Sequence, residues 1–538
     1  MKLREDSIVN EKEKWTGFIL PSYDRKLLRK NTHENPEWLH FGAGNIFRAF
    51  PAMLAQRLIE KGRMKAGIIC CEGYDEEIIE KCFRPYDDLA VIVTLNSDGT
   101  RKKEVVGSVT ESLTLRDDNR LREIFRSASL QMVSFTITEK GYSLRNSKNE
   151  LLLQIAEDIK NGPQKARSLM AKLVSYCLDR FENGAYPLAL VSMDNCSHNG
   201  DRLRNALWEI AEEWERNGFV DKSFLSYLSG NVSFPWSMID KITPRPDERI
   251  REELLKDGLE DMDPVVTSKS TYTAPYVNTE KPQYLVIEDA FPNGRPALED
   301  VGVIFTDRET VDKVEKMKVC TCLNPLHTAL AVFGCLLGYD YIYEEMKDKD
   351  LVALVNKIGY QESLPVVVNP GVLNPEEFIK EVLEVRFPNP FIPDTPQRIA
   401  TDTSQKLGIR FGETLKAYAL FQKKDCSFLK GIPLVFAGWL RYLLAVDDRG
   451  EPFELSPDPM LDAMKEELKG ITLGSRIIKG KTLKSILSDE KIFAVNLYEV
   501  GLGNIVEDYF SRLIAGKGAV RKTLQEVLGQ ADVAGNAQ

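Results

Sequence analysis

Residues 38–62, WLHFGAGNIFRAFPAMLAQRLIEKG, constrain the fold of this chain more than any other segment. They begin as a short apolar strand and end as a helix, with Gly42 and Gly44 in the turn between them. Glycines in such a turn let the backbone approach a pyrophosphate, whose charge would lie at the N-terminus of the following helix. The segment therefore predicts the first strand and helix of a dinucleotide-binding sheet. The residues expected at the cofactor are Gly42, Gly44, Asn45 and Ile46.

The glycine signature is incomplete, because position 47, where a third glycine would fall, holds Phe47. A plain glycine-rich strand-to-helix turn therefore explains the segment about as well. The next strand, AGIICCE, ends in Glu72, where a Rossmann unit presents a carboxylate to the adenosine ribose, and this favours NAD. Glu72 follows Gly44 by 28 residues, more than the usual spacing of about 20. A surface glutamate at a strand end stays an alternative.

The remaining first half continues as a series of strands with polar ends. The β-rich run 130–144 passes through Thr138, Glu139 and Lys140, which we expect in the wall of the cofactor crevice because ligands collect at the carboxyl ends of parallel strands. The strand at 188–193 leads into a polar loop, where Asn195 either hydrogen-bonds substrate or forms an Asx turn. Residues 89–96 and 103–109 predict a hairpin around the turn SDGT.

From about residue 308 onward the pattern changes to long helical segments with short polar or proline breaks. A chain of 538 residues is too long for one ordinary core, so two large domains are expected. The predicted fold is α/β: an N-terminal Rossmann-like, doubly wound sheet over residues 1–307, followed by a mostly α-helical C-terminal domain over residues 308–538.

Within the helical half, residues 318–334, KVCTCLNPLHTALAVFG, concentrate polar side chains at the head of an apolar helix. Asn324 and His327 are three residues apart and share a helix face, and Pro325 favours a helix start with Asn324 as N-cap. Lys318 precedes them, and a lysine withdrawn from water can exchange a proton near neutral pH. The simpler interpretation is an N-cap asparagine, a core histidine and a solvated lysine.

A basic cluster follows at 397–415, QRIATDTSQKLGIRFGETL, where Arg398, Lys406 and Arg410 lie near a helix start. A guanidinium suits bidentate recognition of a carboxylate, although a solvated basic face is the common alternative. Cys320 and Cys322 lie close to His327, but no second pair follows at metal-ligand spacing. We therefore expect no metal.

Composition excludes several classes of protein. Hydrophobic residues make up 43% of the chain and charged residues 28%, as in soluble globular proteins, and we expect no membrane span. The charged N-terminus lacks the apolar core of a secretory signal, and nine cysteines in a long chain fit reduced thiols, so a cytoplasmic location is expected. A net charge of −10 argues against a nucleic-acid surface.

Six ordered blocks resemble the polyol-specific long-chain dehydrogenases, the mannitol dehydrogenase family. The blocks are HFGAGNIFRAF (40–50), TITEKGY (136–142), DNCSHNG (194–200), VSFPWSMIDKITP (232–244), VIEDAFPNGRP (286–296) and LNPLHTALA (323–331). The resemblance implies a Rossmann domain, a helical C-terminal domain, a nicotinamide cofactor, no metal, and alcohol–ketone interconversion. Its catalytic lysine, asparagine and histidine correspond to Lys318, Asn324 and His327, and its other polar site blocks include Asn195 and Asp240.

Two departures from the family pattern concern lysines. The resemblance implies a lysine five residues before the asparagine, whereas Lys318 lies six residues before Asn324, so Lys316 is an alternative proton carrier. Lys241 follows Asp240 where the family usually has arginine. Blocks 194–200 and 286–296 favour the uronate branch of the family, so the expected reaction is reduction of fructuronate to mannonate. Tagaturonate reduction, mannitol oxidation and a cofactor-binding sensor without catalysis are the alternatives.

Overall fold

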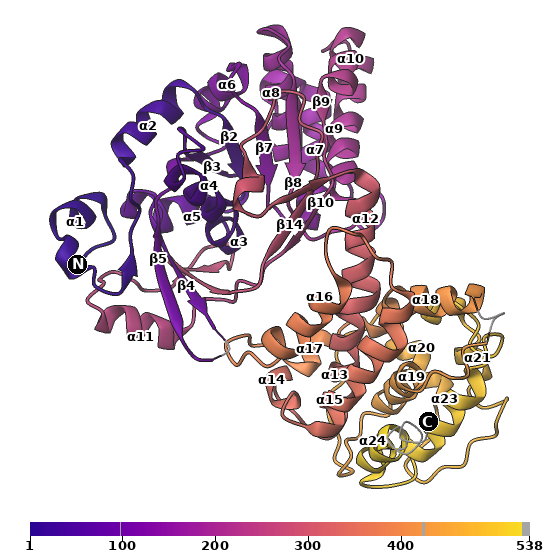
Figure 1. The fold of residues 1–538 in the computed structure, drawn as a ribbon. Coiled ribbons are helices and arrows are strands. Elements are labelled where there is room, and N and C mark those ends of the chain that lie inside the picture. Colours follow the sequence, from indigo (N-terminus) through magenta and orange to yellow (C-terminus); the bar gives the residue numbers. More distant parts are fainter. Residues whose placement is uncertain (97, 422–424, 530–538) are drawn as a thin grey trace. The chain divides into compact units, whose positions relative to one another are not determined.

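The computed structural model describes residues 1–96, 98–421 and 425–529 (Figure 1). Contacts between residues divide the chain into two compact units, Met1–Asp312 and Lys313–Gln538, which we describe one at a time. Ser97, in the turn of the expected hairpin, lies outside the described residues, as do residues 422–424 and 530–538.

A six-stranded parallel sheet forms the centre of the first unit. Its strands, in spatial order, are β6 (Val109–Thr114), β3 (Ile68–Glu72), β2 (Trp38–Phe41), β7 (Met132–Phe135), β8 (Leu188–Ser192) and β9 (Val232–Ser233). Counted along the chain this is the order 3-2-1-4-5-6 of dinucleotide-binding sheets, and the strand order reverses between β2 and β7. The predicted Rossmann-like doubly wound sheet is confirmed.

Helices cover both faces of this sheet because successive side chains of a buried parallel strand point to opposite faces. Leu39, Phe41 and Val133 belong to one apolar cluster, and Trp38 and Met132 belong to the other. The first cluster packs under α6 (Asp118–Arg126), α7 (Leu153–Asn161), α8 (Leu169–Glu182), α9 (Asn199–Arg216) and α10 (Lys222–Gly230). The second packs under α2 (Arg25–Glu34), α3 (Asn45–Ala49), α4 (Pro51–Glu60) and α5 (Glu77–Cys82).

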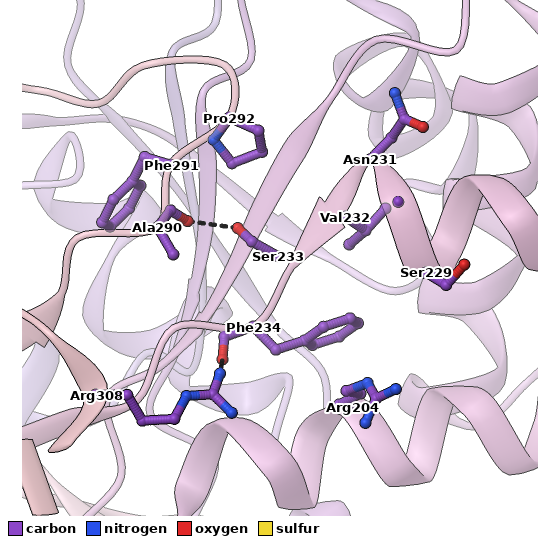
Figure 2. A pocket seen from close by; sticks show the side chains of 11 residues that line it. Arg204, Ser229, Asn231, Val232, Ser233, Phe234, Ala290, Phe291, Pro292 and Arg308 are labelled. Atoms are coloured by element: carbon purple, nitrogen blue, oxygen red, sulfur yellow. Dashed lines mark hydrogen bonds between the residues drawn. The ribbon is translucent and has the colours of Figure 1, made fainter.

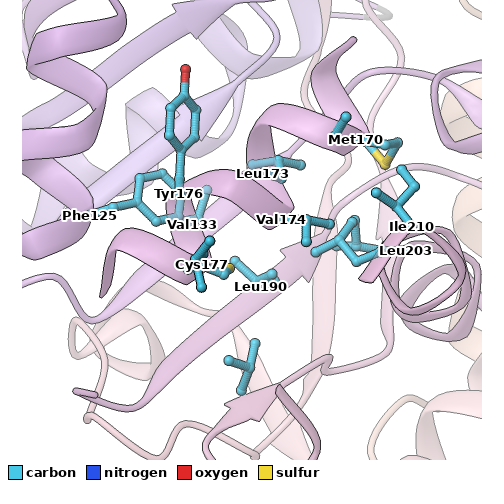
Figure 3. Packing of buried hydrophobic residues seen from close by; sticks show 14 of the residues in the cluster. Phe125, Val133, Met170, Leu173, Val174, Tyr176, Cys177, Leu190, Leu203 and Ile210 are labelled. Atoms are coloured by element: carbon cyan, nitrogen blue, oxygen red, sulfur yellow. The ribbon is translucent and has the colours of Figure 1, made fainter. Parts of the chain in front are cut away.

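Helix α8 shows how one amphipathic helix closes the sheet (Figure 3). Ser168 caps its N-terminus by accepting the Ala171 N–H. Leu173, Val174 and Cys177 belong to the same apolar cluster as Val133 and Leu190 of the strands beneath. Burial of the apolar face of α8 stabilises this packing.

Smaller sheets flank the central one. The expected hairpin is present as β4 (Ala90–Leu95) and β5 (Arg101–Val106), which join β1 (Phe18–Ile19) and β13 (Tyr276–Glu280) in a second sheet. The expected strand 103–109 ends too late, because β6 begins at Val109 and belongs to the central sheet. A third sheet contains β10 (Ser237–Asp240), β14 (Tyr284–Glu288) and β15 (Ile304–Thr306), and a fourth contains β11 (Val265–Val266) and β12 (Tyr272–Thr273). Helices α1 (Glu5–Asn10) and α11 (Glu248–Lys256) complete this unit.

The second unit is mostly helical in the part that the structure describes, as predicted. It begins within α12 (Arg308–Met317), which continues through the π-helical turn η6 (Lys318–Cys322) into α13 (Asn324–Leu337). Its other α-helices are α14 (Ile342–Glu345), α15 (Lys349–Asn356), α16 (Pro375–Glu381), α17 (Pro396–Ile399), α18 (Thr403–Phe421), α19 (Gly431–Tyr442), α20 (Leu461–Glu467), α21 (Lys484–Leu487), α22 (Glu490–Phe493), α23 (Gly503–Leu513) and α24 (Ala519–Gly529).

The helical stretch Arg308–Leu337 corrects one expectation from the sequence, that no segment approaches the length and hydropathy of a membrane span. By those two criteria this stretch qualifies. In the structure, however, 78% of its most apolar window is buried against other parts of the protein, which is how the core helix of a soluble protein behaves.

Candidate active site

The turn after β2 contains two glycines, Gly42 and Gly44, with different structural roles. Gly42 has a φ of +108°, and a Cβ at this position would collide with the carbonyl of Thr136 on the neighbouring strand, so no other residue fits. Gly44 precedes α3, and a Cβ there would meet nothing within 4 Å. No side chain caps α3. The N–H groups at its start, near Asn45 and Ile46, therefore have no side-chain acceptor and could bind a pyrophosphate in the open space beside Gly44.

Glu72 holds this glycine turn in place. Its side chain is buried at the end of β3, where Oε2 accepts the Ala43 N–H at 2.7 Å and Oε1 accepts the N–H groups of Tyr74 at 2.8 Å and Asp75 at 3.2 Å. A carboxylate offers about four acceptor positions. Three backbone bonds therefore leave room for one ribose hydroxyl, so the expected role of Glu72 is compatible with its observed contacts.

Across the strand-order reversal, the loop after β7 carries backbone strain. Thr138 has a φ of +65°, a left-handed conformation that a β-branched residue rarely adopts. Asp194 stabilises it: its two oxygens accept the N–H groups of Ile137 and Thr138, both at 2.9 Å, and the Tyr142 hydroxyl at 2.6 Å. Thr138, Glu139 and Lys140 are exposed at the carboxyl edge of the sheet.

Asp194 positions the Thr138 loop, a role that was not predicted from the sequence. Its place two residues after the end of the apolar strand β8 was the available signal, because polar residues at strand ends line the crevice of such sheets. Asn195, the residue predicted instead, is exposed at the same loop. Asn199 fixes that loop, since its amide nitrogen donates to the carbonyls of Asp194 and Ser237, both at 3.0 Å. Asp240 is buried at the end of β10.

In the helical unit, Lys318 opens the π-helical turn η6. The N–H of Leu323 donates to its carbonyl at 3.1 Å, an i to i+5 bond that holds one more residue per turn than an α-helix does. A turn of this kind has room for the additional residue that the resemblance implies between Lys318 and Asn324. The Lys318 side chain is buried, with 4% of its surface exposed, whereas Lys316 is exposed.

Asn324 is the first residue of α13 and not its N-cap, which corrects the expectation; Leu323 occupies the cap position and no side chain caps the helix. One turn later, His327 stacks on Phe387 with ring centroids 5.0 Å apart, and its Nε2 lies 3.3 Å from Asp394 Oδ2. Burial lowers the pKa of His327. The positive charges of Arg410 and Arg398 lower it further, whereas the carboxylate of Asp394 raises it.

Asp394, which the sequence analysis did not single out, joins His327 to the basic cluster. Burial opposes its ionisation, but His327 and Arg398 hold the pKa of this carboxyl below its usual value. Arg398 forms an ion pair with Asp394 and leaves most of its side chain exposed. Asp394 precedes α17 and lies four residues before Arg398, and this spacing of opposite charges was the signal available in the sequence.

Lys406 and Arg410 both lie on α18. Lys406 Nζ donates to the carbonyl of Thr401 at 2.5 Å, and burial together with Arg410 lowers the Lys406 pKa. Arg410 donates to the Thr328 hydroxyl, which in turn donates to the Asn324 carbonyl at 2.8 Å. Helix α13 packs against α17, α18 and the turn η6, and α18 also packs against η6. The side chains of Lys318, Asn324, His327, Arg398 and Lys406 are therefore carried by neighbouring elements.

Each unit thus brings together part of the predicted set. The first collects Gly42, Gly44, Glu72 and Thr138 near the strand-order reversal, and the second collects Asn324, His327, Arg398 and Lys406 around α13. A pocket of about 510 Å³ in the first unit lies elsewhere, at Ser229–Phe234 and Ala290–Pro292, between the side chains of Arg204 and Arg308 (Figure 2). It contains none of the predicted site residues. Among the described residues, no three His, Cys, Asp or Glu side chains are grouped so that they could hold a metal.

Comparison with known proteins identifies relatives along nearly the whole chain. The model of the mannitol dehydrogenase Rossmann domain matches residues 36–300, and that of the mannitol dehydrogenase C-terminal domain matches residues 310–510. The D-mannonate oxidoreductase of Thermotoga maritima is 51% identical over 99% of this chain and 100% of its own length. Mannitol dehydrogenase 2 of Saccharomyces cerevisiae is 29% identical over 88% of each chain.

Among solved structures, mannitol 2-dehydrogenase of Pseudomonas fluorescens, determined with NAD and D-mannitol, superimposes with a TM-score of 0.70. It is 25% identical, and the match covers 98% of this chain and 100% of that one. The Rossmann-like sheet, the helical second unit and the two family models agree with the resemblance expected from the sequence blocks. The chain belongs to the mannitol dehydrogenase family.

Proposed function

We propose that this chain is an NAD-dependent oxidoreductase that interconverts a ketohexuronate and a hexonate, reducing fructuronate to D-mannonate. The observation that carries the proposal is the 51% identity, over the full length of both chains, to a protein named D-mannonate oxidoreductase. The mannitol dehydrogenase of S. cerevisiae matches at only 29%. We assign NAD binding to residues 1–307 and substrate chemistry to residues 308–538.

The glycine turn fits a dinucleotide, because a side chain at position 44 would occupy open space beside the uncapped start of α3. Gly42, Gly44, Asn45 and Ile46 would hold the pyrophosphate, Glu72 the adenosine ribose, and Thr138, Glu139 and Lys140 the opposite wall of the crevice. Bound NADH supplies a hydride to the ketone carbon. Glu72 would repel a 2′-phosphate, so we expect NADH to be preferred to NADPH.

During reduction, negative charge grows on the carbonyl oxygen, which needs hydrogen-bond donors and a proton. Lys318 as ammonium gives that proton and becomes a neutral amine, which serves as the base in the reverse direction. Its burial, in contrast with the exposed Lys316, supports this assignment. The side-chain amides of Asn324 and Asn195 stabilise the oxygen, and His327 orients substrate. Asp240, Arg398 and Lys406 complete the proposed substrate contacts.

The remaining parts of the proposal concern the binding partner, the metal requirement and the location of the protein in the cell. The partner is a small sugar acid or polyol, with no nucleic acid and no membrane, and catalysis needs no metal because the proposed proton donor and the oxygen-binding amides are side chains of the protein. The place of action is the cytoplasm, because nine cysteines in a long chain are typical of reduced thiols.

The test is NADH oxidation with fructuronate, tagaturonate and fructose side by side, each repeated with NADPH. We expect kcat/KM to be highest for fructuronate with NADH. A higher value for tagaturonate or fructose would move the chain to another branch of the family. Tight NADH binding without turnover of any of the three would favour a cofactor-binding sensor. A preference for NADPH would remove Glu72 from its ribose role.

A further inference from the structure

The basic cluster of the helical unit contains one cation, Arg410, for which the described residues provide no ion-pair partner. Arg398 is paired with Asp394, and Lys406 lies near Asp402 and Asp458. Among the described residues, by contrast, no carboxylate forms an ion pair with Arg410, whose recorded side-chain partner is the Thr328 hydroxyl. Burial lowers the pKa of its guanidinium to about 10, so it stays charged at neutral pH.

A half-buried charge without a counter-charge is costly to keep in a folded protein. Asp394, a carboxylate of the same region, already faces His327 and Arg398. Arg410 instead adds to the positive potential at both His327 and Lys406, which lowers the pKa of each. The charge of Arg410 is therefore not offset by an ion pair within the described residues, and an anion that reached its guanidinium would be attracted.

Arg410 is also linked to the proposed catalytic helix. It donates to Thr328 Oγ1, and the Thr328 hydroxyl donates to the Asn324 carbonyl at 2.8 Å. This bond fixes part of the guanidinium while leaving further N–H groups of its planar fork for a second acceptor. The fork geometry matches a carboxylate in bidentate fashion, which a lysine ammonium does not.

We propose that Arg410 is the residue that binds the substrate carboxylate and so distinguishes sugar acids from neutral polyols. This inference rests on the proposed function and extends it, because it names the contact that selects the substrate class. Arg410 is a binding residue in this scheme and takes no part in proton transfer. Arg398 and Lys406 remain with the substrate hydroxyls.

The test compares fructuronate with its uncharged amide, which has nearly the same shape. For the native enzyme we expect kcat/KM to be about 10²-fold higher with fructuronate, since truncating one partner of a buried charge pair costs this much or more. Arg410→Met should lower kcat/KM for fructuronate by about 10²-fold, mainly through KM, and leave the amide nearly unchanged. Arg410→Lys should fall between them.

Lys416→Ala is the matched control, because Lys416 lies on the same helix and forms only a surface ion pair with Glu413; it should behave as the native enzyme. The thermal midpoint and the NADH dissociation constant of Arg410→Met report whether the variant is folded. An equal loss with both substrates, or no loss with fructuronate, would overturn the assignment. If the native enzyme does not turn over fructuronate at all, the proposed function fails and the assignment fails with it. If the native enzyme reduces fructuronate and Arg410→Met keeps its preference, only the assignment fails.

Discussion

At the scale of single residues, the main question is whether Lys318 or Lys316 is the proton donor of the proposed reaction. Its neighbour Lys316 was the sequence alternative, because the spacing to Asn324 is one residue longer than the family pattern implies. The structure distinguishes the two by burial: Lys318 is 4% exposed at the start of the π-helical turn, whereas Lys316 faces outward on α12. A buried lysine is held in one geometry and is shielded from competing water, which a proton donor requires.

We expect Lys318→Ala to lower turnover by about 10²–10⁴-fold, the usual contribution of a general acid, while the NADH dissociation constant stays nearly unchanged. Lys316→Ala, two residues earlier on the same helix, is the control and should retain native turnover. Steady-state kinetics with fructuronate measures both. An inactive Lys316→Ala beside an active Lys318→Ala would transfer the role to the other lysine, and two active variants would refute the lysine mechanism.

At the scale of secondary-structure elements, the contact between α13 and α14 contains an unusual buried carboxyl, that of Glu345 at the end of α14. Glu345 is fully buried, and among the described residues neither of its oxygens has a hydrogen-bond partner. It lies against Gly334, where a Cβ would collide with it. Burial raises the pKa of Glu345 well above its usual value, and the nearby Asp348 acts in the same direction. The folded state therefore keeps this proton more tightly than the unfolded chain does.

It follows that Glu345 lowers stability as pH rises, because the proton is lost more easily by the unfolded chain once pH exceeds the unfolded pKa of about 4.3. Glu345→Gln keeps the shape and removes the titration, so its thermal midpoint should exceed that of the native protein at pH 8 and approach it at pH 5. Glu344→Gln, at the adjacent and more exposed position, should follow the native protein at both values. Equal midpoints of Glu345→Gln and native protein at pH 8 would contradict the argument.

The elements also show how far the sequence could be interpreted alone. Periodicity and glycine placement predicted the β2–α3 turn, the hairpin and the helical second unit, because these depend on local conformation and on burial of an apolar face. The π-helical turn η6 was not predicted, since its i to i+5 bonds leave no compositional signal. The roles of Asp194 and Asp394 depend on contacts with Thr138 and His327 from other segments, which spacing along the chain does not encode.

At the scale of the whole molecule, each of the two units carries part of the residues proposed for the reaction. The strand order 3-2-1-4-5-6 places the glycine turn and the Thr138 loop at the strand-order reversal of the first unit. The second unit gathers Lys318, Asn324, His327 and a basic cluster on four packed elements. The central claim is that this chain transfers a hydride from NADH to the ketone of a sugar acid, with the proton given by the protein.

The most direct measurement follows the hydride itself. NADH carrying deuterium at both C4 positions is oxidised with fructuronate, and the product is analysed by mass spectrometry and NMR. We predict D-mannonate with one deuterium on the carbon that carried the ketone, one for each NADH consumed. NADH oxidation without deuterium at that carbon, or a product that is not a hexonate, would contradict the account.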